Sequence, residues 1–184
     1  SVGLVVGITT VIIKRGKEPV TFQVSSSPMT KEPISIELME KIEDLKETVR
    51  QDPKDFAAWV KLGSIYAEHH RYREAAEAYS QSLSIKPNDP DIRTNLGLVL
   101  RGLGDYDGAI EEFRKAATSQ PMHINSRYYL GLTLLDDKQN PREAIEAWEE
   151  YLQVEPRGQR ASQVRVEIKR LKAGTAEDKG NKTD

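Results

Sequence analysis

The sequence predicts an all-α protein built from stacked helix hairpins, and a repeated pattern of residue types supports this prediction. The pattern recurs with a period of 34 residues, so that Trp59 corresponds to Arg93 and Arg93 to Arg127. In each copy, a Leu-Gly pair precedes a large residue at a spacing that places all three on one helical face. These residues are Leu62, Gly63 and Tyr66; Leu96, Gly97 and Leu100; and Leu130, Gly131 and Leu134. Each hairpin leaves one flank apolar, so we expect the hairpins to be stable only when stacked.

The second helix of each hairpin is expected to contain an alanine, an aromatic residue and a terminating proline. The alanine provides a small surface where the helices cross, the aromatic side chain fills the gap towards the next unit, and the proline stops the helix. In chain order these residues are Ala75, Tyr79 and Pro87; Ala109, Phe113 and Pro121; and Ala144, Trp148 and Pro156. The third copy has one extra residue in the turn at 138–141. The predicted units are 56–89, 90–123 and 124–158.

One further helix is expected on each side of the three units. Residues 35–52 have apolar residues at helical spacing, with Ser35 as the N-cap, and are typical of a lone second helix. Residues 159–173 are expected to form a C-terminal capping helix, which completes a folded domain of 35–173. Its many cations either dock on an anionic lipid or acidic partner or simply complement the negative end of the helix. The polar tail 174–184 is expected to be disordered.

The N-terminal segment is apolar and is followed by positive charge. Residues 1–13 contain no charged side chain, whereas Lys14, Arg15 and Lys17 follow directly. We interpret 1–13 as the remnant of a single-pass membrane anchor, although a span needs about 20 apolar residues, and a β-strand is the alternative. Residues 14–34 are expected to be a flexible linker. The adjacent cations favour a domain on the cytoplasmic side of the membrane.

The repeated pattern Trp-x2-Leu-Gly-x2-Tyr, followed by Ala-x3-Tyr and Pro, resembles the tetratricopeptide repeat (TPR), and the resemblance covers residues 56–158. It implies a right-handed superhelical α-solenoid of TPR helix hairpins. In such solenoids the first helices line a concave groove that binds a protein or peptide. Arg93 and Arg127 stand where the family often has Trp, and their long stems are expected to cover apolar surface.

The residues expected to face the groove lie opposite the Leu-Gly face of each first helix. Tyr128 and Leu132 suit an apolar peptide anchor, and Asn95 suits hydrogen bonding to an extended backbone. The candidate peptide-binding residues are Val60, Ser64, Asn95, Leu98, Arg101, Asn125, Tyr128, Tyr129, Leu132 and Leu135. TPR cochaperones bind the carboxylate of a chaperone tail with a pattern of Lys, Asn and Arg residues. Only Asn95 matches this pattern, so that role is not predicted.

Composition excludes several other functions. The net charge of −2 provides no large positive field for nucleic acid, and the absence of cysteine excludes disulfides and thiolate chemistry. His69, His70 and His123 are interpreted as residues of solvated turns. No phosphate loop or nucleophile elbow is present. We therefore predict no catalytic residue, no metal ligand, no cofactor and no nucleic-acid partner.

The resulting hypothesis is a non-enzymatic, membrane-tethered TPR scaffold that binds a peptide or protein segment and serves complex assembly. The layout is similar to that of bacterial envelope TPR proteins. It is also similar to the TPR modules of the cytochrome c maturation apparatus, which capture unfolded apocytochrome and would place the domain in the periplasm. A third alternative is a structural protein that assembles into a homo-oligomer.

Overall fold

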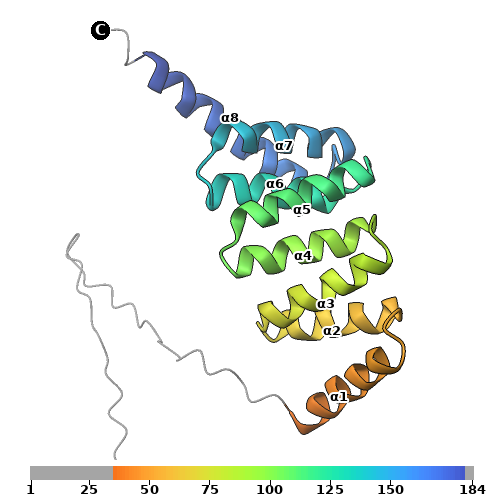
Figure 1. Cartoon of the computed structure of the whole chain (residues 1–184). Coiled ribbons are helices and arrows are strands. Elements are labelled where there is room, and N and C mark those ends of the chain that lie inside the picture. The colour runs from red at the N-terminus through yellow and green to blue at the C-terminus, as the bar shows by residue number, and fades with distance from the viewer. Residues whose placement is uncertain (1–34, 181–184) are drawn as a thin grey trace, which may run out of the picture. The chain divides into compact units, whose positions relative to one another are not determined.

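The computed structural model describes residues 35–180, and this range is folded into helices without any strand (Figure 1). The helices are α1 (Ile36–Gln51), α2 (Phe56–Glu68), α3 (Tyr72–Ile85), α4 (Pro90–Gly102), α5 (Tyr106–Ser119), α6 (Ile124–Asp136), α7 (Pro141–Val154) and α8 (Gln159–Gly180). The predicted all-α class is confirmed. The interpretations of 1–13 as an anchor and of 14–34 as a linker lie outside the described residues. Within the described range, no helix combines the length and apolarity that crossing a bilayer requires.

The helices form the predicted hairpins, which follow one another in chain order. The most extensive packing is within the pairs α2/α3, α4/α5 and α6/α7, and each hairpin also packs against the next through α3/α4 and α5/α6. Figure 1 shows this succession from α1 to α8. Helix α1 packs on α2 and α8 packs on α7, as expected of flanking helices. The first helices α4 and α6 also contact each other directly.

Each hairpin is closed by an aromatic ring that lies on a glycine. A Cβ added at Gly63 would stand 2.6 Å from the Tyr79 ring, and one at Gly97 would stand 2.5 Å from Phe113. The ring of Trp148 crowds Gly131 in the same way. The expectation that glycine permits close helix approach is therefore confirmed. Each ring thus packs against the first helix of its own hairpin, and Phe113 also reaches the next unit, as expected, by stacking on Tyr129.

The turn inside each hairpin contains one residue with a left-handed backbone. These residues are His70, Gly104 and Gln139, with φ angles of 56°, 81° and 50°. Only glycine adopts this conformation without steric cost. The turn of the third hairpin accommodates its extra residue while the backbone N–H of Asn140 donates to the Leu134 carbonyl at 2.8 Å. The insertion therefore changes the turn and leaves the hairpin intact.

Most helices begin at a side chain that accepts a backbone N–H. Ser35 accepts from Leu38 at 3.2 Å, which confirms the predicted N-cap of α1. Asp55, Asp89, Asp105, His123 and Asn140 cap α2, α4, α5, α6 and α7. Helix α8 continues to Gly180, whereas the sequence predicted an end at 173 and disorder from 174. Gly174 and Thr175 have low helix propensity, but the segment contains no proline, so the helix can continue through it.

The apolar interior consists of three adjoining clusters. The first joins α1 to α4, the second lies between α4 and α7, and the third joins α6 and α7 to α8. Leu100 packs against both the first and the second cluster, and Leu135 packs against both the second and the third. Burial of these clusters stabilises neighbouring hairpins against each other, as expected of repeats that share apolar flanks.

Candidate protein-binding face

The ten predicted peptide-binding residues all lie on α2, α4 and α6, and we call this set the first-helix face. Nine of them are half-buried and Asn125 is exposed. None of the ten lines either of two hollows in the described part of the chain, one next to α5 and one lined by α1, α2 and α3. The proposed binding role of the first-helix face therefore stays a prediction, although its residues are accessible enough to contact a partner.

The first repeat offers little free hydrogen-bonding capacity on this face. The hydroxyl of Ser64 donates to the Val60 carbonyl at 3.0 Å and lies 3.2 Å from the hydroxyl of Tyr79. Burial raises the pKa of Tyr79, and the hydrogen bond with Ser64 offsets part of that effect. Because both hydroxyls are satisfied within the hairpin, Ser64 contributes shape to the face rather than a free donor.

The second repeat contributes a free amide and a compensated charge. Among the described residues no side-chain or backbone group hydrogen-bonds to the amide of Asn95, which leaves it available to a partner's backbone. Arg101 instead donates to Asp137 and lies 3.6 Å from Asp136, on the helix of the next repeat. This bridge fits the direct packing of α4 on α6. Two carboxylates therefore already neutralise Arg101, so a ligand on this face would meet a compensated charge at that position.

The third repeat is aromatic and is partly covered by α8. The ring of Tyr129 stacks on Phe113 with centroids 6.1 Å apart, and Tyr128 meets Tyr129 edge-on at 5.3 Å. Leu132 and Leu135 pack against the cluster that includes α8. The guanidinium of Arg160 on α8 lies 4.5 Å from the centre of the Tyr128 ring. Helix α8 thus borders the first-helix face, a relationship that was not predicted.

Trp59 and Arg93, at equivalent positions of successive repeats, make the same hydrogen bond. The indole N–H of Trp59 donates to the Pro53 carbonyl at 3.0 Å, and Nε of Arg93 donates to the Pro87 carbonyl at 3.0 Å. Arg93 adds an ion pair with Glu112 at 2.5 Å. Arg127 is buried and donates to the carbonyls of His123 and Ala117. Arginine therefore replaces tryptophan by holding backbone carbonyls between repeats, in addition to packing.

His123 is a buried helix cap, so its interpretation as a solvated turn residue is wrong. Its Nδ1 accepts the backbone N–H of Ser126 at 3.3 Å, and its Nε2 lies 3.0 Å from Oδ1 of Asp91 in the preceding repeat. Because Nδ1 accepts a hydrogen bond, the ring proton lies on Nε2, which donates a hydrogen bond to Oδ1 of Asp91. The sequence signal was present, because Asp55 and Asp89 occupy the corresponding caps at a spacing of 34 residues. His69 and His70 are exposed turn residues as expected.

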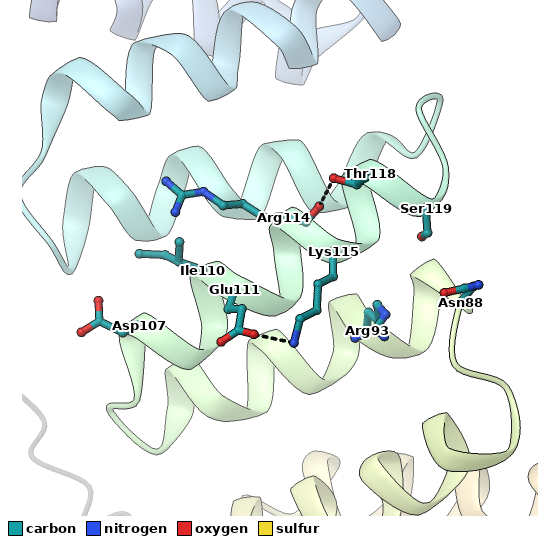
Figure 2. A pocket seen from close by; sticks show the side chains of 9 residues that line it. All are labelled: Asn88, Arg93, Asp107, Ile110, Glu111, Arg114, Lys115, Thr118 and Ser119. Carbon is teal, nitrogen blue, oxygen red and sulfur yellow. Dashed lines mark hydrogen bonds and ion pairs between the residues drawn. The ribbon is translucent and has the colours of Figure 1, made fainter.

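A hollow of about 660 Å³ lies outside the first-helix face, along α5 and the start of α4 (Figure 2). Three cations line it, but each is paired with a carboxylate. Lys115 contacts Glu111 at 2.6 Å, Arg93 contacts Glu112, and Arg114 reaches Glu143 on α7 at 2.6 Å. These contacts raise the pKa of Lys115 and lower that of Glu111. The hollow is charge-compensated and offers no free anion site.

In the part of the chain that the structure describes, no group of three or more potential ligand residues is placed to hold a metal ion.

A model of the family described as cytochrome c-type biogenesis protein H TPR domain matches residues 26–162. The chain belongs to this family. The match to this TPR family includes α1 to α7 and the beginning of α8. The predicted TPR solenoid is thereby confirmed, and the chain is a TPR scaffold for protein interaction.

Individual proteins and solved structures are also similar to this chain over parts of its length. The N-terminal acetyltransferase A complex auxiliary subunit NAA15 of Arabidopsis thaliana is 29% identical over 104 residues, which is 56% of this chain but only 11% of that relative. The crystal structure of MamA has a TM-score of 0.62 at 19% identity and covers 80% of this chain and 96% of that chain. A TPR protein from Parabacteroides merdae has a TM-score of 0.66 at 22% identity, over 76% of this chain and 55% of that chain. At these identities the two structures show a shared fold alone.

Proposed function

We propose that this chain is a non-enzymatic module that holds a segment of an unfolded apocytochrome on its first-helix face during cytochrome c biogenesis. The observation that carries the proposal is membership of the cytochrome c-type biogenesis protein H TPR family over residues 26–162. A biogenesis factor of this kind needs to retain a partner reversibly without performing chemistry on it. A stack of hairpins with an accessible face meets that need.

The residues of the first-helix face support capture of a protein segment. Asn95 offers an unsatisfied amide to a peptide backbone, whose own polar groups must be paired when they leave water. Leu98, Tyr129 and Leu132 are half-buried apolar side chains from two repeats. A partner side chain placed on them would remove apolar surface from water, at about 25 cal/mol for each Å² buried.

We further propose that residues 1–13 tether the module to a membrane and that the TPR domain lies on the extracytoplasmic side. The apolar composition of this segment supports the tether, and the family supports the location. The positive charges at 14–17 favour the opposite orientation. Fusing alkaline phosphatase after residue 184 tests the choice, because this enzyme is active only after export. An inactive fusion that is well expressed would contradict the extracytoplasmic location.

The binding proposal is tested with an array of 20-residue peptides that tile c-type apocytochromes. We expect a subset of the peptides to bind residues 35–180, and we expect Asn95→Ala or Leu98→Ser to weaken that binding at least fivefold while circular dichroism stays unchanged. Leu103→Ser is the matched control, because Leu103 is exposed and lies outside the first-helix face. If no peptide binds, or if all three variants behave alike, the assignment of the face is wrong.

In-cell crosslinking provides an independent readout. A photoreactive residue at position 98 should form a crosslink to an apocytochrome, while the same residue at position 103 should not. Position 98 is preferable to 128 because Arg160 covers the ring of Tyr128.

Light scattering of residues 35–180 at several concentrations tests the alternative that the protein is structural and assembles into a homo-oligomer. A concentration-dependent mass that Leu98→Ser abolishes would favour self-assembly over capture.

A further inference from the structure

Helix α8 places one arginine on two residues of the first-helix face. The guanidinium of Arg160 lies 4.5 Å from the centre of the Tyr128 ring, and its Nη1 donates to Oδ1 of Asn125 at 3.2 Å. The ring of Tyr128 is itself fixed, since it packs on Tyr151 with centroids 5.8 Å apart. The flat cation is therefore held on an aromatic ring and oriented by an amide, at the boundary between α6 and α8.

The charge of Arg160 is not compensated. No carboxylate among the described side chains forms an ion pair with it, although it is one of several cations near the start of α8. The neighbouring cations are differently placed. Arg165 donates to the Pro156 carbonyl, Arg170 pairs with Glu167, and Lys172 pairs with Glu149 at 2.6 Å. Arg157, Arg165 and Lys169 also form no ion pair with a described carboxylate, but Arg160 differs from them because it is held against the first-helix face.

A guanidinium that is stacked and hydrogen-bonded has lost most of its side-chain freedom before a ligand arrives. Its planar array of donors matches the two oxygens of a carboxylate, and such charge-assisted hydrogen bonds are about twice as strong as neutral ones. Asn125 occupies only one of the five N–H donors of Arg160. The remaining donors can bind an anion without displacing the existing contact.

We propose that Arg160, supported by Tyr128 and Asn125, is a carboxylate-binding subsite at the end of the first-helix face. The segment that it recognises carries an Asp or Glu side chain or a C-terminal carboxylate close to an apolar side chain, which packs on Tyr129 and Leu132. This inference rests on the proposed function of that face and adds the chemical class of the segment. It assigns α8 a role in selecting the partner in addition to capping the stack.

The test uses the apocytochrome peptide that binds most tightly in the array described above. The peptide is synthesised in three forms: unchanged, with its acidic side chains replaced by amides, and with an amidated C-terminus. Binding of each form is measured for the wild-type domain, for Arg160→Gln, and for Lys169→Gln. The last variant is the matched control, because Lys169 is an exposed cation of the same helix and its substitution changes the net charge equally.

We expect one of the two neutralised peptides to bind the wild-type domain about tenfold more weakly than the unchanged peptide, as for loss of one charge-assisted contact. Arg160→Gln should bind the unchanged and the neutralised forms equally, and Lys169→Gln should discriminate as the wild type does. If the peptide with amide side chains loses affinity, the carboxylate comes from an Asp or Glu side chain. If the peptide with the amidated C-terminus loses affinity, the carboxylate is the chain terminus. A merely structural Arg160 would lower the melting temperature on substitution without removing this discrimination.

Several outcomes would overturn the proposal while leaving the proposed function intact. One is that Arg160→Gln still discriminates between charged and neutral peptides, although Asn95→Ala weakens all of them. Another is that Lys169→Gln loses as much discrimination as Arg160→Gln, which would indicate a diffuse charge effect. If Arg160→Gln abolishes sedimentation with vesicles of phosphatidylglycerol and phosphatidylcholine but leaves peptide discrimination unchanged, the cation binds lipid instead. If no peptide in the array binds, both the proposed function and this inference fail.

Discussion

The ring of Phe113 lies so close to Gly97 that a Cβ at the glycine would stand 2.5 Å from Cε1 of the ring. Phe113 is fully buried between the two helices of its hairpin. Close-packed interiors accommodate an added methyl group only by shifting neighbouring atoms. The glycine is thus required at this crossing, even though it lowers the intrinsic stability of the helix.

Replacing Gly97 with alanine is expected to destabilise the domain. The displaced ring should cost about 1–3 kcal/mol in the free energy of unfolding, which outweighs the helical gain from alanine. Urea unfolding followed by circular dichroism measures the change. Gly174→Ala is the control, because no atom lies within 4 Å of a Cβ at that exposed position of α8. Equal stability of the two variants would contradict the proposed crossing.

The turn residue His70 is expected to tolerate glycine with a gain in stability. Its φ of 56° is left-handed, which is costly for a residue with a side chain, and Gly104 occupies the same place in the second hairpin. We expect His70→Gly to raise the free energy of unfolding by about 0.5–1 kcal/mol, although it loses an exposed hydrogen bond to Tyr72. His69→Gly should give no such gain, since the φ of His69 is −97°. A loss of stability in His70→Gly would refute this explanation.

The buried cap His123 is expected to stabilise α6 and its contact with the second repeat. His123→Ala removes the acceptor for the Ser126 N–H and the contact with Asp91, and should cost about 1–2 kcal/mol. His123→Asn should recover most of the cap, because Asn is a preferred N-cap residue. Thermal unfolding of the three proteins compares them. If alanine and asparagine prove equally destabilising, the cap is not the source of the stabilisation.

The stability of the domain should decline at high pH because of Tyr79. Burial raises the pKa of Tyr79 above its ordinary value of 10.0. Above pH 10 the phenol ionises more readily in the unfolded chain, so unfolding releases a proton there. The stabilisation that comes from keeping the Tyr79 phenol neutral is therefore complete below pH 10. It is lost as the pH rises through the pKa of Tyr79 in the folded protein. Tyr151 adds to this decline, since burial raises its pKa as well.

Urea unfolding at intervals from pH 8 to pH 11 measures the decline. Tyr79→Phe should be less stable than the wild type at pH 8, because it loses the hydrogen bond with Ser64, but its stability should fall less steeply above pH 10. Tyr106→Phe is the control, since Tyr106 is less deeply buried. A decline in Tyr79→Phe as steep as that in the wild type would show that another group titrates.

Periodicity determined most of what could be predicted about the fold. Leu62, Gly63 and their counterparts recur at one period, and a recurring pattern constrains every hairpin at once. The end of α8 lacked this support, because charged and small residues beyond 173 are compatible with both helix and coil. An unusual residue type at a repeat position also weakens the prediction. Histidine is typical of solvated turns, yet His123 occupies the same cap position as Asp89.

The candidate site was predicted less completely than the fold. Residues on α2, α4 and α6 follow from helical geometry, but the period does not reveal which of them another side chain covers. Arg160 follows Asn125 by 35 residues, the length of the third repeat with its extra turn residue. It thus occupies the second position of a fourth first helix. The capping role predicted for 159–173 does not by itself indicate this relationship.

The division of the apolar interior has a consequence for how the molecule can admit a partner. Leu100 and Leu135, which pack against two neighbouring clusters each, are only half-buried. Loss of the contact between two clusters would therefore remove little apolar packing within either cluster. Neighbouring hairpins therefore depend on one another only locally, in keeping with the nearest-neighbour character of repeat proteins. Helix α8 belongs to the same unit as α6 and α7, because Ala161, Val164 and Ile168 are buried in the third cluster. An incoming polypeptide would therefore meet Arg160 and Tyr128 as parts of one packed unit, whatever happens to the packing at the other end of the stack.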